Sequence, residues 1–113
     1  MRTLLVIAAV LLIAALGVAQ GSHSATLSWQ DTQNPSGTTY SVYRATGLCS
    51  GTPTFSKIAS ALTAKTYQDT TVQPGNYCYE VTATFNGMES APSNTALAPV
   101  PSFPPSALSV TVQ

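Results

Sequence analysis

Charged side chains are scarce in this chain of 113 residues, which has four Lys and Arg, four Asp and Glu, and one His. No basic patch is present that would bind nucleic acid or an anionic membrane surface. Hydrolases hold a nucleophile, a base and an orienting group together, and the single histidine, His23, lies near the start of the mature chain. We therefore expect no enzyme activity.

Cofactor and metal motifs are also missing. Two cysteines 29 residues apart and one histidine lack the spacing of metal ligands, and there is no Cys-x-x-Cys motif or glycine-rich phosphate loop. Glu80 and Glu89 could be imagined as a glycosidase pair, but a chain of this length has no room for both a β-sandwich and an aromatic cleft. We predict no metal and no cofactor.

Residues 1–19 have the pattern of a cleaved secretory signal peptide. Arg2 precedes an apolar run over residues 4–16, and Gly17-Val18-Ala19 supplies small residues for cleavage after Ala19, with Gly17 as the alternative. The run is shorter than the roughly 18 to 20 residues that span a bilayer. We expect a secreted protein, extracellular or at the cell surface with the periplasm as an alternative, and no membrane contact after cleavage.

The stretch over residues 77–85 is the strongest structural signal in the mature chain. Tyr77, Tyr79, Val81, Ala83 and Phe85 alternate with polar residues and Cys78, which predicts a strand with one core face. Asn86-Gly87 follows, and this pair favours a tight type I′ turn into an antiparallel partner beginning near Met88.

Further short strands are predicted on both sides of this one, and helical periodicity is absent. They cover residues 24–29, 39–44, 55–58 and 65–69, with a weak, proline-containing edge strand over 89–97. Such spacing indicates an all-β, antiparallel sandwich. The expected core residues are Leu27, Trp29, Tyr40, Val42, Ile58, Tyr67, Tyr77, Tyr79, Val81 and Ala83.

Five motifs in order resemble a bacterial fibronectin type III domain, an immunoglobulin-like sandwich. They are Leu27-Ser28-Trp29, Tyr40-Ser41-Val42-Tyr43-Arg44, Tyr67-Gln68-Asp69 with Val72, the stretch over residues 74–83, and Glu89-Ser90-Ala91-Pro92-Ser93-Asn94. The resemblance runs from about Ser24 to Leu97, and the domain is expected over residues 20–98. It implies that Tyr77 is a tyrosine-corner residue with its hydroxyl bonded to nearby backbone, and that strand 39–44 lies beside strand 77–85. The family says little about ligand.

Cys49 and Cys78 are the only cysteines, and in an exported chain a disulfide between them is the default. If strands 39–44 and 77–85 are neighbours, as the resemblance implies, the loop that carries Cys49 can fold back onto Cys78. A bridge closing about 30 residues would contribute roughly 3.5 kcal/mol to the stability of so small a domain.

The ends of the chain depart from the family. The first strand of a type III domain is missing before Ser24, whereas a proline-rich linker over residues 99–105 leads to an additional strand over 106–113. In that strand Leu108, Val110 and Val112 alternate with polar residues, as in the opening strand of a type III repeat. The missing strand therefore stands at the wrong end of the chain.

Three arrangements are compatible with this order. The strand can insert into its own domain, fill the empty position of a neighbouring molecule, or remain an appended piece of a second repeat. Donation needs no return path and builds a head-to-tail filament, because such a contact does not close on itself. We expect a non-catalytic interaction or structural protein whose partner is a second copy; the alternative is a monomeric extracellular module that binds polysaccharide or a surface protein.

Tyr43 is the one side chain that suggests a ligand surface. It should point outward from strand 39–44 beside Thr82 and Thr84, where its ring could stack on a sugar or a partner, or else cover a neighbouring strand. We favour the structural role.

Overall fold

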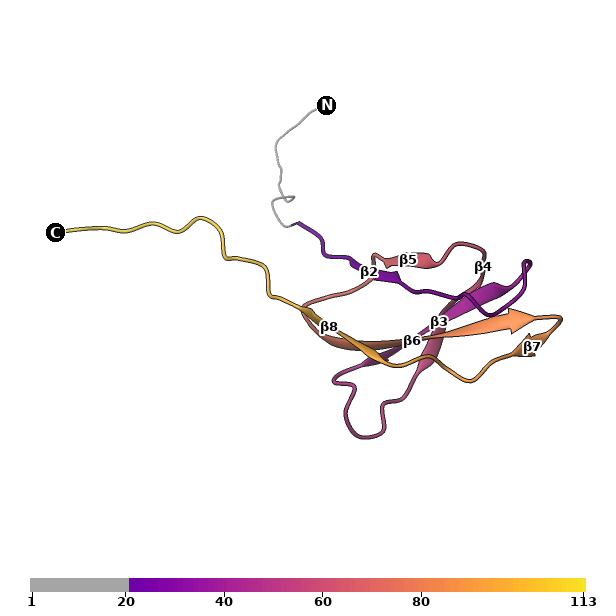
Figure 1. Ribbon diagram of the computed structural model, residues 1–113. Coiled ribbons are helices and arrows are strands. Elements are labelled where there is room, and N and C mark those ends of the chain that lie inside the picture. Colours follow the sequence, from indigo (N-terminus) through magenta and orange to yellow (C-terminus); the bar gives the residue numbers. More distant parts are fainter. Residues whose placement is uncertain (1–20) are drawn as a thin grey trace, which may run out of the picture. The chain divides into compact units, whose positions relative to one another are not determined.

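The computed structural model describes residues 21–113 (Figure 1). The predicted signal peptide lies outside the described residues. Residues 23–101 form one compact unit and residues 102–113 belong to another. Every regular element in the described part is a strand, which confirms the all-β prediction.

The strands of the compact unit form two antiparallel sheets. The smaller sheet pairs β2 (Ala25–Ser28) with β5 (Thr66–Asp69). The larger sheet has the order β4 (Ser56–Leu62), β3 (Thr39–Thr46) and β6 (Gly75–Phe85), and the far side of β6 pairs with both β7 (Met88–Glu89) and β8 (Ala96–Val100). The two sheets make the predicted sandwich.

β6 is the longest strand and organises the larger sheet. It pairs with the whole of β3, from Thr39 opposite Thr84 to Thr46 opposite Tyr77, which confirms that these strands are neighbours. At its end Asn86 and Gly87 have φ angles of 52° and 74°, and Phe85 lies opposite Met88. The two-residue hairpin is therefore confirmed, because both turn residues have the positive φ that a type I′ turn requires.

The predicted edge strand over residues 89–97 is divided in the structure. Between β7 and β8, Ser90 and Ser93 donate their backbone N–H groups to the carbonyl oxygens of Ala83 and Val81 (2.7 and 2.8 Å), and their hydroxyl groups accept from the N–H groups of the same two residues (3.0 Å each). Serine hydroxyls thus replace part of the ladder around Pro92, which has no N–H to donate. β8 then continues through Val100, two residues into the expected linker.

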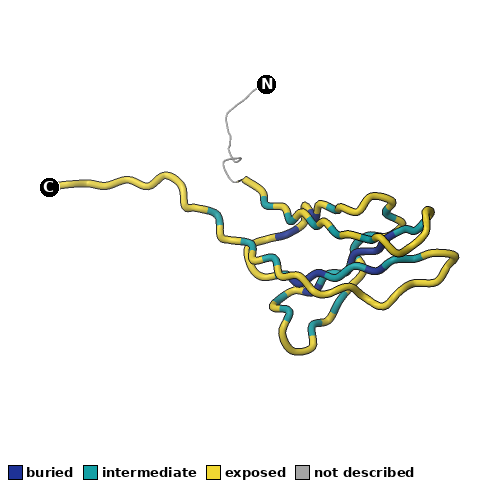
Figure 2. The backbone as a smooth tube through the Cα atoms, viewed as in Figure 1, coloured by how far each residue is buried: buried dark blue, intermediate teal, exposed yellow. Residues whose placement is uncertain are grey.

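The core is concentrated on β3 and β6 (Figure 2). Of the expected core residues Tyr40, Val42 and Tyr79 are fully buried, whereas Leu27, Trp29, Ile58, Tyr67, Tyr77, Val81 and Ala83 are half-buried. Two residues predicted to face outward, Cys78 and Thr82, are buried instead. Cys78 is bridged to Cys49 in the loop after β3, and the Thr82 hydroxyl donates to Glu89.

Residues 106–113 have no regular secondary structure in the single chain, and their predicted strand, which needs a partner strand, stays a prediction. Leu108, Val110 and Val112 are 89, 79 and 86% exposed. A single strand has no partner for its backbone N–H and C=O groups, so alternation alone does not hold it in β geometry.

Candidate functional site

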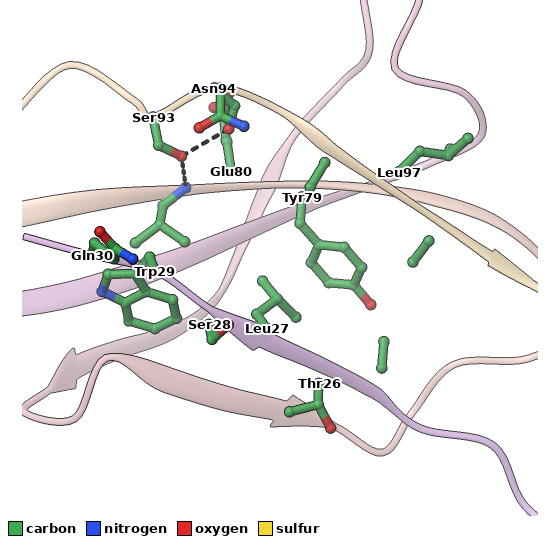
Figure 3. Close-up of a pocket in the computed structure, with 14 residues that line it drawn as sticks. Thr26, Leu27, Ser28, Trp29, Gln30, Tyr79, Glu80, Ser93, Asn94 and Leu97 are labelled. Carbon is green, nitrogen blue, oxygen red and sulfur yellow. Dashed lines mark hydrogen bonds between the residues drawn. The ribbon is translucent and has the colours of Figure 1, made fainter.

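A cavity of about 550 Å³, here called the edge groove, opens between the two sheets (Figure 3). It is lined by residues 25–30 on and just after β2, residues 79–81 on β6, and Ser93, Asn94, Ala96, Leu97 and Ala98 on and before β8. All of these residues belong to the compact unit. Figure 3 shows Leu27, Trp29 and Tyr79 around one hollow, with Leu97 on the β8 side.

The groove is open because the two strands that border it each have a neighbour on one side only. Within the described residues, β2 pairs with β5, and β8 pairs with β6. No described strand lies between β2 and β8. Leu27 and Trp29 consequently stay half-buried, and Leu97 is 48% exposed.

The free edge of β2 also presents backbone groups. Trp29 donates its N–H to the carbonyl oxygen of Lys65 (3.0 Å), on the β5 side. Successive residues of a strand direct their backbone polar groups to opposite sides. The N–H and C=O groups of Thr26 and Ser28 therefore face away from β5, toward the side where no described strand lies. Unpaired groups of this kind are a template for an added strand.

Trp29 forms one end of the groove. Its ring packs edge-on against Tyr40, with 5.5 Å between centroids. The indole Nε1 is buried and has no hydrogen-bond partner in the described part of the chain. Most buried polar atoms in proteins have a hydrogen-bond partner, so the Trp29 indole N–H leaves one hydrogen bond unmade at this end of the groove.

A buried carboxylate, Asp69 at the end of β5, joins the two sheets. It accepts hydrogen bonds from the Tyr79 hydroxyl (2.7 Å), the Arg44 guanidinium (2.8 Å) and the Thr71 hydroxyl (2.6 Å). Burial raises the pKa of Asp69, but the hydrogen bonds from Thr71, Tyr79 and Arg44 outweigh it and lower the pKa to about 2. Asp69 is thus a structural anion, and burial together with its hydrogen bond raises the pKa of Tyr79.

Sequence reasoning gave Asp69 no role. The sequence did contain a clue: Asp69 is two residues after Tyr67 in the same strand, so both side chains point to the same face, and Tyr67 was expected to face the core. Its partners Arg44 and Tyr79 come from β3 and β6, and pattern alone does not reveal which cation an inward carboxylate meets.

Tyr77, the expected tyrosine-corner residue, is half-buried at the start of β6. Its hydroxyl accepts a hydrogen bond from the backbone N–H of Gln73 (3.0 Å). The Arg44 guanidinium lies 5.0 Å from its ring centroid. These contacts hold the turn before β6 against the sheet.

Tyr43 is engaged with its own sheet. Its hydroxyl donates to Oε2 of Glu89 (2.5 Å), which also accepts from the Thr82 hydroxyl (2.6 Å), and Lys57 Nζ lies 5.6 Å from the Tyr43 ring centroid. The hydrogen bonds from Thr82 and Tyr43 lower the pKa of Glu89. The polar tip of Tyr43 and the carboxylate of Glu89 are therefore occupied by intramolecular contacts, which favours a structural role for both.

The predicted disulfide between Cys49 and Cys78 is present, with 5.2 Å between the Cα atoms. It attaches the loop after β3 to β6, and Gly47 in this loop also donates its N–H to the carbonyl oxygen of Asn76 (2.8 Å). This loop accounts for the burial of Cys78, which alternation had assigned to an outer face. A disulfide in a small β domain is consistent with an extracellular location.

Among residues 21–113, no group of three or more His, Cys, Asp and Glu side chains is arranged to hold a metal ion. No helix in this part of the chain has the length and apolar character to cross a membrane.

Known structures identify the fold. The chain is similar to the solution structure of the fourth fibronectin type III domain of a human protein, with a TM-score of 0.58 and 24% sequence identity, over 78% of this chain and 75% of that one. No family model and no curated protein matches the sequence. Sandwich, strand order and structural match together show that this chain has the fold of a fibronectin type III domain.

Proposed function

We propose that the chain is an exported, non-catalytic assembly subunit whose edge groove accepts residues 106–113 of a neighbouring copy. The observation that carries this proposal is the presence, in one chain, of an open groove beside a free strand edge and of an exposed segment with strand alternation. Domains of this fold commonly act as protein-interaction modules, and added strands are a recurrent mode of peptide recognition.

The segment matches the groove in length and polarity. Six consecutive residues of β2 and its continuation, 25–30, line the groove, and the segment has eight residues. Full burial of Leu108, Val110 and Val112 would stabilise the complex by about 1.5–3 kcal/mol each. Association itself costs about 4–15 kcal/mol, so backbone hydrogen bonds to β2 have to contribute and assembly should depend on concentration.

Chain length favours a neighbouring copy over the molecule itself. β8 ends at Val100, at the end of the sandwich where β2 begins (Figure 1). A strand antiparallel to β2 starts at the opposite end, near Ser93, about 23 Å back along the chain at about 3.3 Å per residue. From Val100 to Leu108, the first apolar residue of the segment, the chain spans about 25 Å in polyproline geometry, at about 3.1 Å per residue. The inclusion of Pro99 and Val100 in β8 therefore leaves almost no slack for this return, whereas donation to a neighbouring copy requires none.

Repeated donation produces a linear polymer. Each copy offers its groove at one place and its segment at another, so the contact is heterologous and does not close into a dimer. The product would be a filament at the cell surface or outside the cell.

Light scattering and electron microscopy on residues 20–113 test the proposal, beside a version that ends at Pro101. We expect concentration-dependent rods from the full chain and monomers from the truncation. The triple variant Leu108→Ser, Val110→Ser, Val112→Ser should behave like the truncation. The matched control Ser109→Ala, Thr111→Ala alters the polar face of the same segment and should still assemble.

A full chain that remains a compact monomer at all concentrations would overturn the proposal. If the truncation then unfolds or aggregates, the segment closes its own sandwich, and the protein is a monomeric module whose polysaccharide or protein ligand must be sought separately.

A further inference from the structure

We infer the polarity and register of the donated strand, an inference that rests on the proposed function. The strand pairs antiparallel with β2 of the acceptor, so that Leu108 lies opposite Trp29, Val110 opposite Leu27, and Val112 opposite Ala25. The occupant is thus residues 108–112 of a second copy, and its place in the groove is defined residue by residue.

The face of each residue gives the first constraint. In β2, Ala25 and Leu27 point into the sandwich, as Trp29 does just beyond it, whereas Thr26 and Ser28 are exposed. Residues directly opposite one another in an antiparallel pair place their side chains on the same face. The three apolar donor residues must therefore lie opposite inward-facing residues, the set to which Ala25, Leu27 and Trp29 belong. A shift by one residue would turn them to solvent.

The backbone gives a second constraint, and it agrees with the first. Because Trp29 bonds to Lys65 on the β5 side, the outward-facing residues Thr26 and Ser28 present their N–H and C=O groups to the incoming strand. In the inferred register Ser109 lies opposite Ser28 and Thr111 opposite Thr26. Each pair exchanges two backbone hydrogen bonds and places its hydroxyl groups together on the outer face.

A shift of the register by two residues keeps the apolar donor side chains pointing inward, but it removes one of their apolar contacts. Moving the donor one way places Leu108 opposite Asp31, whose carboxylate accepts hydrogen bonds from Asn34 and Tyr40. Moving it the other way places Val112 opposite His23, beyond the apolar wall of the groove. Only the central register keeps Leu108, Val110 and Val112 against apolar residues of β2 and Trp29.

The polarity follows from the direction of β8. Figure 3 shows β2 and β8 running in opposite directions along the groove, so a strand antiparallel to β2 runs in the direction of β8. In a head-to-tail row of similarly oriented copies, the chain that leaves β8 of one subunit enters the next groove without reversing. The stiff prolines Pro101, Pro104 and Pro105 favour such a straight path.

Paired cysteines test this register. Two chains carry matched substitutions, Thr26→Cys with Thr111→Cys and Ser28→Cys with Ser109→Cys. Two control chains carry the shifted combinations, Thr26→Cys with Ser109→Cys and Ser28→Cys with Thr111→Cys. Matched Cα atoms would lie about 5.5 Å apart, within the range that a disulfide bridges, whereas the shifted pairs are displaced by two residues, about 6.6 Å along the strand.

After mild oxidation, non-reducing electrophoresis should show ladders of covalent multimers from both matched chains and single bands from both shifted chains. Native Cys78 is fully buried in its bridge, and the unsubstituted protein controls for exchange. If a shifted chain forms ladders and the matched chains do not, the register is wrong and strand donation stands. If both shifted chains form ladders, the donated strand runs parallel to β2. An internal cross-link within monomers, or no cross-link in a protein that scatters as a monomer, overturns both the register and the proposed function.

Discussion

The hydroxyl of Tyr79 in β6 donates a hydrogen bond of 2.7 Å to Oδ2 of Asp69 at the end of β5. Both residues are 2% exposed. This contact joins the larger sheet to the smaller one, which within residues 21–113 has two strands and shares no backbone ladder with it. The smaller sheet is thus held by a buried polar cluster as well as by apolar packing.

Tyr79→Phe should lower the free energy of unfolding by about 1.5–3 kcal/mol, because it removes a hydrogen bond to a charged, buried carboxylate. Urea denaturation followed by Trp29 fluorescence measures the change. Tyr67→Phe is a matched control on a half-buried tyrosine and should change stability by less than about 1 kcal/mol. Equal losses in the two variants would contradict a special role for the Tyr79 contact.

Stability should fall in acid because of Asp69. Its pKa is lowered to about 2 in the folded protein, below the value near 3.9 of an unfolded chain. A lowered carboxyl pKa stabilises the fold above the unfolded value, and this contribution is lost as pH falls from about 4 toward 2. The expected loss is about 2 kcal/mol at roughly 1.4 kcal/mol per pKa unit.

Urea midpoints measured between pH 5 and pH 2 would show this dependence. Asp31 also has a lowered pKa, because Asn34 and Tyr40 donate to its carboxylate, and it acts in the same direction. Asp31→Asn therefore serves as the control that leaves the Asp69 contribution in place. A midpoint independent of pH in that variant would refute the assignment to Asp69.

Removing the disulfide with Cys49→Ala and Cys78→Ala should cost about 3.5 kcal/mol, since the bridge closes a loop of about 30 residues. Differential scanning calorimetry of the double variant against the native protein measures the difference. The native protein under reductant provides an independent comparison. A double variant as stable as the native protein would show that Gly47 and the other loop contacts suffice.

Local pattern predicts much of this fold. Alternation over residues 77–85, the Asn86-Gly87 turn and the spacing of short strands are sufficient for an antiparallel sandwich with β6 at its centre. The cysteine pair in a chain with a signal-like start predicts the bridge. These features depend on near neighbours in the sequence, so they can be recognised without knowing which segments meet.

Other features depend on contacts between distant segments. Cys78 and Thr82 lie on the face that alternation assigns to solvent, yet a loop covers the first and Glu89 caps the second. Asp69 has the phase of a core residue, but its partners come from β3 and β6. The hydroxyl of Tyr43 donates a hydrogen bond to Glu89, which is 46 positions away in the sequence.

The sequence by itself determined the alternation over residues 77–85, the Asn86-Gly87 turn and the alternation of Leu108, Val110 and Val112 after the proline-rich stretch. Only the tertiary structure decided that no described strand lies between β2 and β8, that β2 presents its backbone on that side, and that β8 shortens the linker by ending at Val100. The physical reason is that side-chain alternation records which face of a strand is apolar, whereas the occupancy of a strand edge depends on segments far away in the chain.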